Sequence, residues 1–299
     1  MSAPTQRAAS EPVPTTNRAH PAIGALFVLL WSTGFIGAKL GLPYAEPLTF
    51  LALRMVIVAS LLLVVAVLTR APWPHSPRAW WHAAIAGLLV QCGYLGGVFS
   101  AIANGMSAGV VALIVGLQPL LTAFTAAPLF GERTTPRQWS GLVLGLIGVA
   151  LVLSRNVGSA MSSEGLVLAA LALVSMTAGT LYQKRFGSAM DFRTGGVIQY
   201  ATSAMVLLPL AALTESMRIA WSVPFVFALA WLSLVLSIGA IGLLYVLIRR
   251  GRATQVSSLF YLTPPVTAVL AFLAFGETLT PLAIAGMVIA VVGVALVNR

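Results

Sequence analysis

The sequence predicts an all-α membrane protein in which ten transmembrane helices form two inverted five-helix repeats around a central cavity, with the N and C termini both cytoplasmic. Three observations lead to this prediction. The chain carries too few charges to cover a soluble globule, its apolar runs are long enough to span a bilayer, and its two halves share residues at one constant offset.

The composition is that of a protein surrounded by lipid. Of the 299 residues, 59% are hydrophobic and 8% are charged, whereas a soluble domain carries about 25% charged residues. The basic residues form short clusters between apolar runs, as in loops that face an anionic leaflet, so membrane lipids and no nucleic acid are expected as partners. The single cysteine, Cys92, excludes an intrachain disulfide and a thiolate metal site, and no metal or cofactor is expected.

The apolar runs define the elements in order. Residues 1–20, rich in Ser, Thr, Pro and Ala, are expected to form a disordered cytoplasmic tail. A helix that crosses the bilayer needs about 20 residues. Runs of this length are expected to form helices at 22–41, 48–69, 81–103, 107–129, 136–154, 165–185, 194–213, 224–248, 254–275 and 281–298. The first repeat is therefore placed at 21–154, a connecting loop at 155–164 and the second repeat at 165–299.

The distribution of Lys and Arg sets the orientation. With the N terminus inside, 13 basic residues fall on the cytoplasmic side and 4 on or near the other. This bias is the positive-inside pattern of membrane proteins.

The duplication has a constant offset of 145 residues. Across residues 108–152, 19 of 45 positions are identical at this offset, including Pro119 with Pro264 and Glu132 with Glu277. Because each repeat has an odd number of helices, the second copy must enter the membrane from the opposite face. Inverted repeats place a substrate site near the midplane between the halves, where rocking exposes it to each side in turn.

Several motifs resemble one known family. Trp31-Ser-Thr-Gly-Phe-Ile-Gly-Ala-Lys39, Arg54, Pro119 and the Gly131-Glu132-Arg133 turn resemble the EamA-type members of the drug/metabolite transporter superfamily, over about residues 21–299. The resemblance implies ten helices around a central cavity in an inner membrane. For many bacterial members it also implies export of amino acids, with exporters of aromatic and other neutral amino acids among the comparisons.

Polar residues within the predicted spans are candidates for the transport path. Lys39 is either an interfacial anchor or a cation at the cavity mouth that attracts a carboxylate. Gln91 and Tyr94 are three residues apart and share a helix face, which fits a cavity lining or hydrogen bonds between helices. Arg54 is interpreted as a structural contact. Five further residues are expected on the substrate path, because they lie deep within the predicted spans and on the helices that line the cavity in the family that the chain resembles. They are Trp31, Gln118, Tyr182, Tyr245 and Tyr261.

Prolines and glycines suggest where the bundle bends and packs. Pro119, Pro264 and Pro265 remove backbone donors within the fourth and ninth runs, so they are expected to act as hinges or packing kinks. Glu132 is expected to support the start of the fifth helix. Gly141, Gly145 and Gly148 form a small-residue stripe that serves either the fold or a dimer, and a monomer is expected to suffice.

The predicted function is secondary transport of small metabolites by alternating access, most simply amino acid export. No phosphate-binding loop that would drive it with ATP is present, and no acid lies clearly within a span, so facilitated diffusion stays open beside proton coupling. The alternatives are efflux of drugs or other organic metabolites, and a membrane-embedded enzyme. No catalytic cluster at one depth supports the enzyme, so no catalytic residue is assigned.

Overall fold

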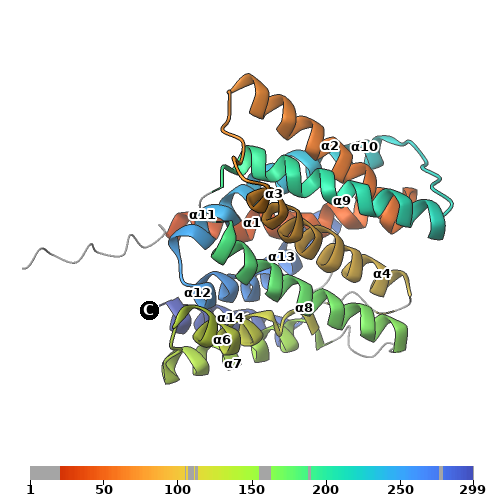
Figure 1. The fold of residues 1–299 in the computed structure, drawn as a ribbon. Coiled ribbons are helices and arrows are strands. Elements are labelled where there is room, and N and C mark those ends of the chain that lie inside the picture. The colour runs from red at the N-terminus through yellow and green to blue at the C-terminus, as the bar shows by residue number, and fades with distance from the viewer. Residues whose placement is uncertain are drawn as a thin grey trace, which may run out of the picture.

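The computed structural model describes residues 21–104, 106, 111, 114–154, 163–187, 190–275 and 279–298. These residues form a bundle of helices that lie side by side, as Figure 1 shows. Eight helices in this part of the chain are long and apolar enough to cross a membrane, and Pro136–Val152 is a shorter apolar helix. The fourth predicted span lies partly outside the described residues, so the number ten stays a prediction.

The first half contains six α-helices and two other helical segments among the described residues. They are α1 (Pro21–Gly41), the 3₁₀ helix η1 (Leu42–Tyr44), α2 (Pro47–Leu68), α3 (Pro77–Gly87), the π-helix η2 (Leu88–Gly96), α4 (Gly97–Ala103), α6 (Gln118–Phe130) and α7 (Pro136–Val152).

The second half contains seven α-helices and two other helical segments among the described residues. Its elements are α8 (Ser163–Phe186), α9 (Phe192–Thr214), α10 (Val223–Trp231), the π-helix η4 (Leu232–Ala240), α11 (Ile241–Arg250), α12 (Ala253–Ser258), the 3₁₀ helix η5 (Leu259–Leu262), α13 (Thr263–Phe275) and α14 (Pro281–Asn298).

Local sequence signals set the helix ends. The Ser76 hydroxyl accepts from the Ala79 backbone N–H at the start of α3, and Ser222 caps α10 in the same way. Thr135 and Gln138 form a reciprocal capping box at the start of α7. Gly131 ends α6 with a positive φ of 68°, a conformation that glycine adopts without a steric penalty.

Four predicted spans depart from regular α-helix along their length. The third and eighth pass through π-helical segments, η2 and η4, at their middles. In the fourth, a turn at Gly116–Leu117 precedes α6, and Pro119 is the second residue of that helix. In the ninth, Pro264 and Pro265 follow η5 as the second and third residues of α13. All three prolines therefore lie in the first turn of an α-helical segment, where a missing N–H costs little, and whether they act as hinges stays a prediction.

Two antiparallel helix pairs form opposite edges of the bundle. At one edge the helices α2 and α9 pack together, and at the other edge α7 packs against α14, while α1, α3 and α13 lie between them (Figure 1). The direction of the first pair follows from its ends. Thr194, at the start of α9, donates to the Pro72 carbonyl beyond the end of α2, and Glu215, at the end of α9, accepts from the start of α2.

The α7–α14 seam is a backbone-to-backbone contact. A Cβ on Gly141 would lie 2.6 Å from the Gly293 carbonyl oxygen, and one on Gly148 would lie 2.5 Å from the Ala290 nitrogen. The glycine stripe of the fifth span therefore serves the fold, because it lets the two helices approach closely.

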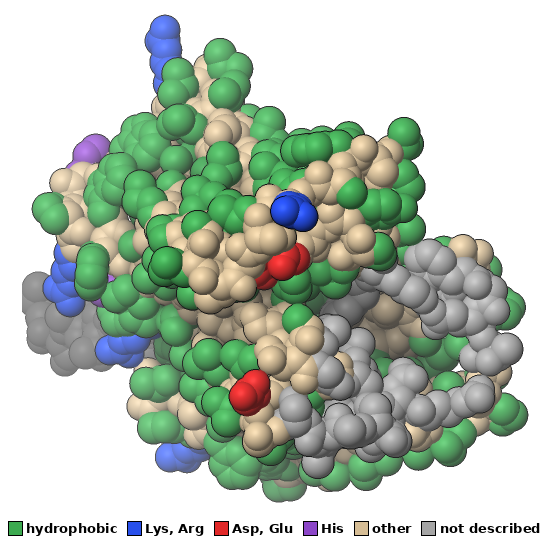
Figure 2. Space-filling view, turned by 90° about the vertical axis from the view of Figure 1, so that its right-hand side faces the viewer, with side chains coloured by type: hydrophobic (Ala, Val, Ile, Leu, Met, Phe, Trp, Pro, Cys, Tyr) green, Lys and Arg blue, Asp and Glu red, His purple; other side chains and the backbone are tan. Residues whose placement is uncertain are grey.

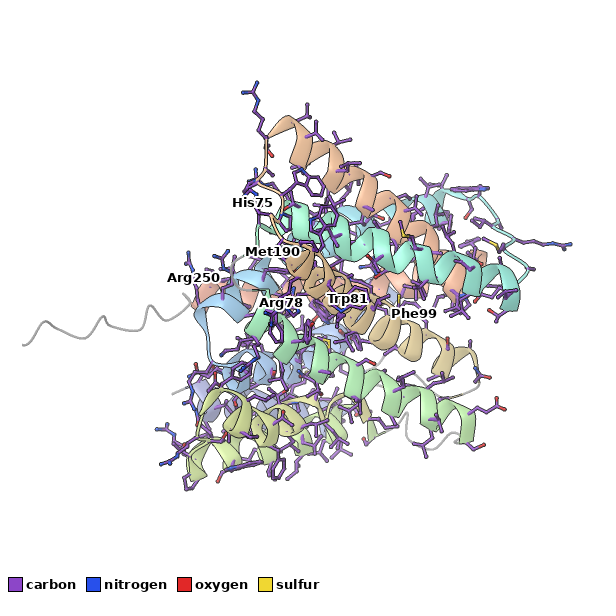
Figure 3. The ribbon with its side chains drawn as sticks, viewed as in Figure 1. His75, Arg78, Trp81, Phe99, Met190 and Arg250 are labelled. Carbon is purple, nitrogen blue, oxygen red and sulfur yellow. The ribbon has the colours of Figure 1, made fainter. Side chains whose placement is uncertain are left out.

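The outer surface is largely apolar and the charges lie at the ends. Leu68, Leu213 and Val223 are each more than three-quarters exposed, and hydrophobic side chains cover much of the face in Figure 2. Figure 3 shows His75, Arg78 and Arg250 together at one end of the bundle, which we call the basic end. The opposite end, which carries Glu46 and Glu215, is called the acidic end.

Candidate functional site

The interior contains a polar cluster that connects four elements. We call it the Arg54 cluster: Arg54 of α2, Gln91 and Tyr94 of η2, Tyr200 of α9 and Ser237 of η4. All five side chains are buried. Polar groups in such a setting need hydrogen-bond partners, since neither lipid nor apolar side chains can supply them.

Arg54 is 2% exposed and has one hydrogen-bonding partner in the described part of the chain. Its Nε and Nη2 atoms donate to the Ser237 hydroxyl at 3.1 and 2.9 Å. Ser237 in turn donates to the Leu232 carbonyl five residues earlier, at 3.0 Å, within the π-helical segment. The phenols of Tyr94 and Tyr200 lie near the guanidinium. No carboxylate among the described residues forms a salt bridge with Arg54.

Gln91 is the least satisfied group of the cluster. Its side chain is 1% exposed, and neither its amide oxygen nor its amide nitrogen has a hydrogen-bond partner in the described structure. The Tyr200 hydroxyl lies near the amide but without hydrogen-bonding geometry. Tyr94, in the same π-helical segment, is also buried. Among the residues predicted from the sequence, the structure thus brings Gln91 and Tyr94 together with Arg54.

A second polar cluster lies in the other part of the interior. Gln118, the first residue of α6, donates to the hydroxyls of Thr122 and Ser257 at 3.2 and 3.1 Å, and Ser257 donates to Thr122 at 3.3 Å. These three residues, which we call the Gln118 cluster, join α6 to α12. The amide oxygen of Gln118 has no partner.

The other predicted aromatic residues lie in separate surroundings. Tyr245 of α11 accepts a hydrogen bond from the Gln199 amide, and its ring meets Phe192 edge-on. Tyr261 of η5 packs against Gly145 of the α7–α14 seam, and its hydroxyl has no partner. Trp31 packs edge-on against Phe260, with ring centroids 5.2 Å apart. These residues contribute to buried packing in the described conformation.

Tyr182 and Lys39 stand apart from both clusters. The Tyr182 hydroxyl lies 2.6 Å from Nδ1 of His82, and the His82 ring stacks on Phe186 with centroids 4.2 Å apart. This group joins α3 to α8 and is only partly buried. Lys39 belongs to α1, but its side chain lies outside the described residues.

The loops at the basic end are joined through Glu132. Its carboxylate forms a salt bridge of 2.5 Å with Lys184 and accepts from the backbone N–H of Ala253, the first residue of α12. Lys184 also donates to the Gly251 carbonyl. Glu132 therefore supports the start of α12 and not that of α7, which Thr135 and Gln138 cap instead. We call this group the Glu132 clasp.

At the same end, Asp191 caps α9. Its carboxylate accepts from the backbone N–H of Arg193 and pairs with the Arg193 guanidinium at 2.7 Å. The Arg193 side chain holds the pKa of the Asp191 carboxyl below its usual range.

The acidic end has a clasp of its own. Glu215 accepts from the Leu48 and Thr49 backbone N–H groups at 2.8 and 2.7 Å, where α2 begins, and Glu46 accepts from Ser216. A cavity of about 500 Å³ adjoins this clasp, between the α1–α2 connection, the end of α4 and the segment that carries Arg218.

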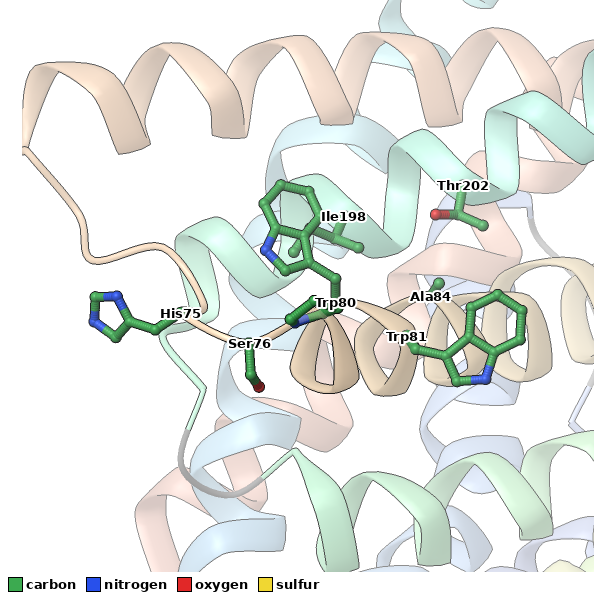
Figure 4. A pocket seen from close by; sticks show the side chains of 8 residues that line it. His75, Ser76, Trp80, Trp81, Ala84, Ile198 and Thr202 are labelled. Carbon is green, nitrogen blue, oxygen red and sulfur yellow. The ribbon is translucent and has the colours of Figure 1, made fainter.

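The surface of the described residues also has a groove at the basic end. It measures about 510 Å³ and lies between α3 and α9, beside Trp80 and Trp81 (Figure 4). Both tryptophans are exposed at a helix end, as in the aromatic belts of membrane proteins. The groove does not reach the Arg54 cluster.

The interpretation of Arg54 as a structural contact agrees with its hydrogen bonds to Ser237, whereas Tyr200 and Ser237 were not predicted from the sequence. The signal for such partners is Arg54 itself, because a cation within an apolar span needs partners on other helices. Serines 233 and 237 are the polar residues of the eighth span that could have supplied one. The π-helical segments have no sequence signature of comparable strength.

Comparison with known proteins identifies the relatives. The model of the EamA-like transporter family matches residues 22–154 and again residues 163–299. The chain is 30% identical to the uncharacterized transporter YvbV of Bacillus subtilis (strain 168) over 278 residues, which cover 92% of this chain and 90% of the relative. It is 28% identical to the uncharacterized inner membrane transporter YedA of Escherichia coli (strain K12), over 92% of this chain and 91% of that protein.

Two further relatives extend the comparison. A probable amino-acid metabolite efflux pump of Salmonella typhimurium is 26% identical, over 91% of this chain and 92% of its own length. A solved crystal structure shares the fold with a TM-score of 0.76 at 21% identity, covering 92% of this chain and 96% of its own. The comparisons and the apolar helices together describe a multi-pass inner-membrane protein.

Proposed function

The chain belongs to the EamA-like transporter family of the drug/metabolite transporter superfamily, and from this premise we propose that it exports amino acids or related small metabolites by alternating access. That it is a membrane transporter follows from the family. The substrate class and the mechanism are the proposal. A relative that is a probable amino-acid metabolite efflux pump supports the substrate class.

The observation that carries the mechanism is the pairing of corresponding helices. The helices α2 and α9 occupy equivalent positions in the two halves, as do α7 and α14, and each pair packs together. The antiparallel direction of α2 and α9 supports an inverted repeat, in which residues 21–154 and 165–299 are the two units and residues 155–164 connect them. Such repeats provide the symmetry for exposing a midplane site to either side.

The polar interior is proposed as the substrate path. Gln91 and Tyr94 line it in η2 and Gln118 lines it in α6, while Trp31, Tyr182, Tyr245 and Tyr261 supply aromatic surface as the two halves move. Lys39 is proposed to attract substrate at the mouth. The turn before Pro119 and the 3₁₀ segment before Pro264 and Pro265 are proposed as the hinges, since a few residues at element ends can absorb a change of backbone angles.

The basic end is proposed to face the cytoplasm. Lys184, Arg249 and Arg250 lie there, and positive charge is enriched in cytoplasmic loops. The repeat itself can be tested at Thr69 and Thr214, which are 145 residues apart, exposed, and located at the ends of α2 and α9. In a Cys92→Ala background, Thr69→Cys should react with an impermeant thiol reagent from the cytoplasmic side and Thr214→Cys from the opposite side. Labelling of both from one side would refute the inverted topology.

Transport itself is tested with purified protein in liposomes. Vesicles loaded with unlabelled neutral or aromatic amino acid should accumulate the labelled compound by counterflow, and vesicles without protein should not. We propose that flux follows the substrate gradient, because the acids of the described part of the chain lie at helix ends. A protonophore should then leave net efflux of the substrate down a fixed gradient unchanged. Flux of a cationic dye but of no amino acid would replace the export proposal with drug efflux.

A further inference from the structure

Two π-helical segments lie at matching places in the halves. Leu88–Gly96 and Leu232–Ala240 form the middles of the third and eighth spans. A π-helix bonds each N–H to the carbonyl five residues earlier and is frequently found at functional sites. Here the first segment carries Gln91 and Tyr94, and the second carries Ser237.

Arg54 lies between these segments as a cation without an anion. It is buried, and its hydrogen bonds in the described structure go to one neutral oxygen, that of Ser237. A guanidinium has five N–H donors in a planar fork that matches a carboxylate. Buried charges normally pair with an opposite charge, and none of the described carboxylates forms a salt bridge with it.

Other polar groups near Arg54 also lack hydrogen-bond partners in the described part of the chain. Among the described residues, both polar atoms of Gln91 lack hydrogen-bond partners, and so does the hydroxyl of Ser233, four residues before Ser237. These groups can donate or accept hydrogen bonds, so they suit a ligand that carries polar atoms of both kinds.

The described residues also leave room beside Gly96. This glycine is buried, yet a Cβ built on it would meet no atom of the described residues within 4 Å. In a π-helix the N–H of Gly96 reaches the carbonyl of Gln91, five residues earlier, so this space adjoins the turn that carries the unpartnered amide.

We propose that Arg54 binds the carboxylate of the transported metabolite, with Gln91 and Tyr94 contacting the rest of its polar head. This inference rests on the proposed function and narrows it. The substrate carries a carboxylate, and organic cations are excluded because the described part of the site offers them a positive charge and no acid.

The assignment differs from a purely structural role for Arg54 in what it demands of the substrate. A structural arginine would hold α2 against η4 through Ser237 whatever the vesicles contain. A binding arginine makes transport depend on the negative charge of the ligand. The substrate, and not only the protein, is therefore the variable to change.

The experiment uses pairs of compounds that differ at the carboxyl group alone. Phenylalanine, leucine and glutamine are each compared with their amides as competitors of counterflow by the wild-type protein, together with 3-phenylpropionate, which keeps the carboxylate and lacks the ammonium group. Acids should compete and raise the thermal midpoint of the protein in detergent. Amides should be weaker competitors by about tenfold or more, because a charge-assisted bidentate contact is lost.

Variants then connect the preference to Arg54. Arg54→Gln should abolish the difference between acid and amide. Arg54→Lys keeps the charge but not the fork, so it should retain the preference with a higher KM. Arg250→Gln, at an exposed site at the basic end, is the matched control and should behave as wild type. If Arg54→Gln does not fold, Arg54→Lys and the wild-type thermal shifts still decide the matter.

The outcomes separate the two claims. Transport of amides or of organic cations as readily as acids would overturn the role of Arg54 and leave the transporter in place. An acid preference that survives in a folded Arg54→Gln protein would also overturn it. Absence of flux for every compound would overturn the proposed export and this assignment together.

Discussion

Two buried regions of the molecule use glycine in opposite ways. In the α7–α14 seam, Gly141 and Gly148 bring two backbones into contact, and no space is left for a Cβ. In the π-helical segment that carries Gln91 and Tyr94, Gly96 is equally buried, but a Cβ on it would meet no atom of the described residues. The first arrangement fixes two helices against each other. The second leaves room in the middle of the third predicted span, where a ligand or a moving side chain can enter.

Buried amides show the same contrast. Gln138 in α7 closes the capping box with Thr135 and donates to the Val297 carbonyl of α14, so the seam satisfies it. Gln91 has no partner at either atom. An unsatisfied buried amide destabilises the fold, and residues that impair stability in this way are concentrated at functional sites. We therefore interpret the α7–α14 seam as a structural scaffold and the Arg54 cluster as the region that serves transport.

The largest effect is expected from one substitution made in both regions. Gly148→Ala places a Cβ against the backbone of α14, 2.5 Å from the Ala290 nitrogen. Because backbone must shift, the free energy of unfolding should fall by about 1–3 kcal/mol. Gly96→Ala should leave it unchanged or raise it by about 0.5–1 kcal/mol, since alanine favours helix. Thermal midpoints in detergent provide the measurement, and equal midpoints for the two variants would end the contrast.

Filling the open space should stop transport without unfolding the protein. Gly96→Val adds three carbon atoms where the structure leaves room, so we expect counterflow to fall by about tenfold or more while the midpoint stays near wild type. Gly96→Ala, with one added carbon, serves as the control for the change of residue. Full activity of Gly96→Val would show that the space is not used by substrate.

The buried amides give a prediction in which stability and activity change in opposite directions. Gln91→Leu removes two unsatisfied polar atoms, so it should stabilise the protein by up to about 1–3 kcal/mol and reduce transport. Gln138→Leu removes two hydrogen bonds that are made and should destabilise it. Melting curves and initial counterflow rates on the same preparations test both statements. A destabilised Gln91→Leu protein would mean that Gln91 has partners the fold depends on.

The sequence predicted the scaffold better than the site for a physical reason. Apolar length, the offset of 145 and the Gly141–Gly145–Gly148 stripe are properties of the chain itself, and they correctly indicated membrane helices and a close helix contact. The cluster around Arg54 depends on which face of η4 meets α2. Ser237 could be recognised as a partner only once the π-helical segment and the α2–α9 packing were known. The prolines marked where the regular α-helix changes, but the turn before Pro119 and the 3₁₀ segment before Pro264 leave no pattern in the composition.

A smaller effect on transport is expected from a change at the Glu132 clasp. The same change at the acidic end allows the two ends of the bundle to be compared. Glu132→Gln removes the charge that pairs with Lys184 but keeps an acceptor for the Ala253 N–H. The loops at the basic end should separate more readily, and transport should change by a few-fold, because a partly buried pair contributes modestly. Glu215→Gln at the acidic end is the matched change. Initial counterflow rates and the protease accessibility of the loops provide the measurement. Identical behaviour of Glu132→Gln and wild type would exclude a gating role for the clasp.

The smallest effect concerns the pH dependence of the α2–α9 edge. Arg193 holds the pKa of Asp191 below its usual range, so the charged carboxylate is favoured in the folded state. Its stabilising contribution is therefore present above the unfolded pKa of about 3.9 and is lost as pH falls from there through the lower folded value. Asp191→Asn should abolish this component, while Asp191→Glu should retain part of it. Thermal midpoints of Asp191→Asn should lie below wild type at pH 6 and approach it as the pH falls through that acid window, with Glu46→Gln as the control at the acidic end. A difference that persists unchanged at low pH would show that Asp191 acts through the helix cap and not through its charge.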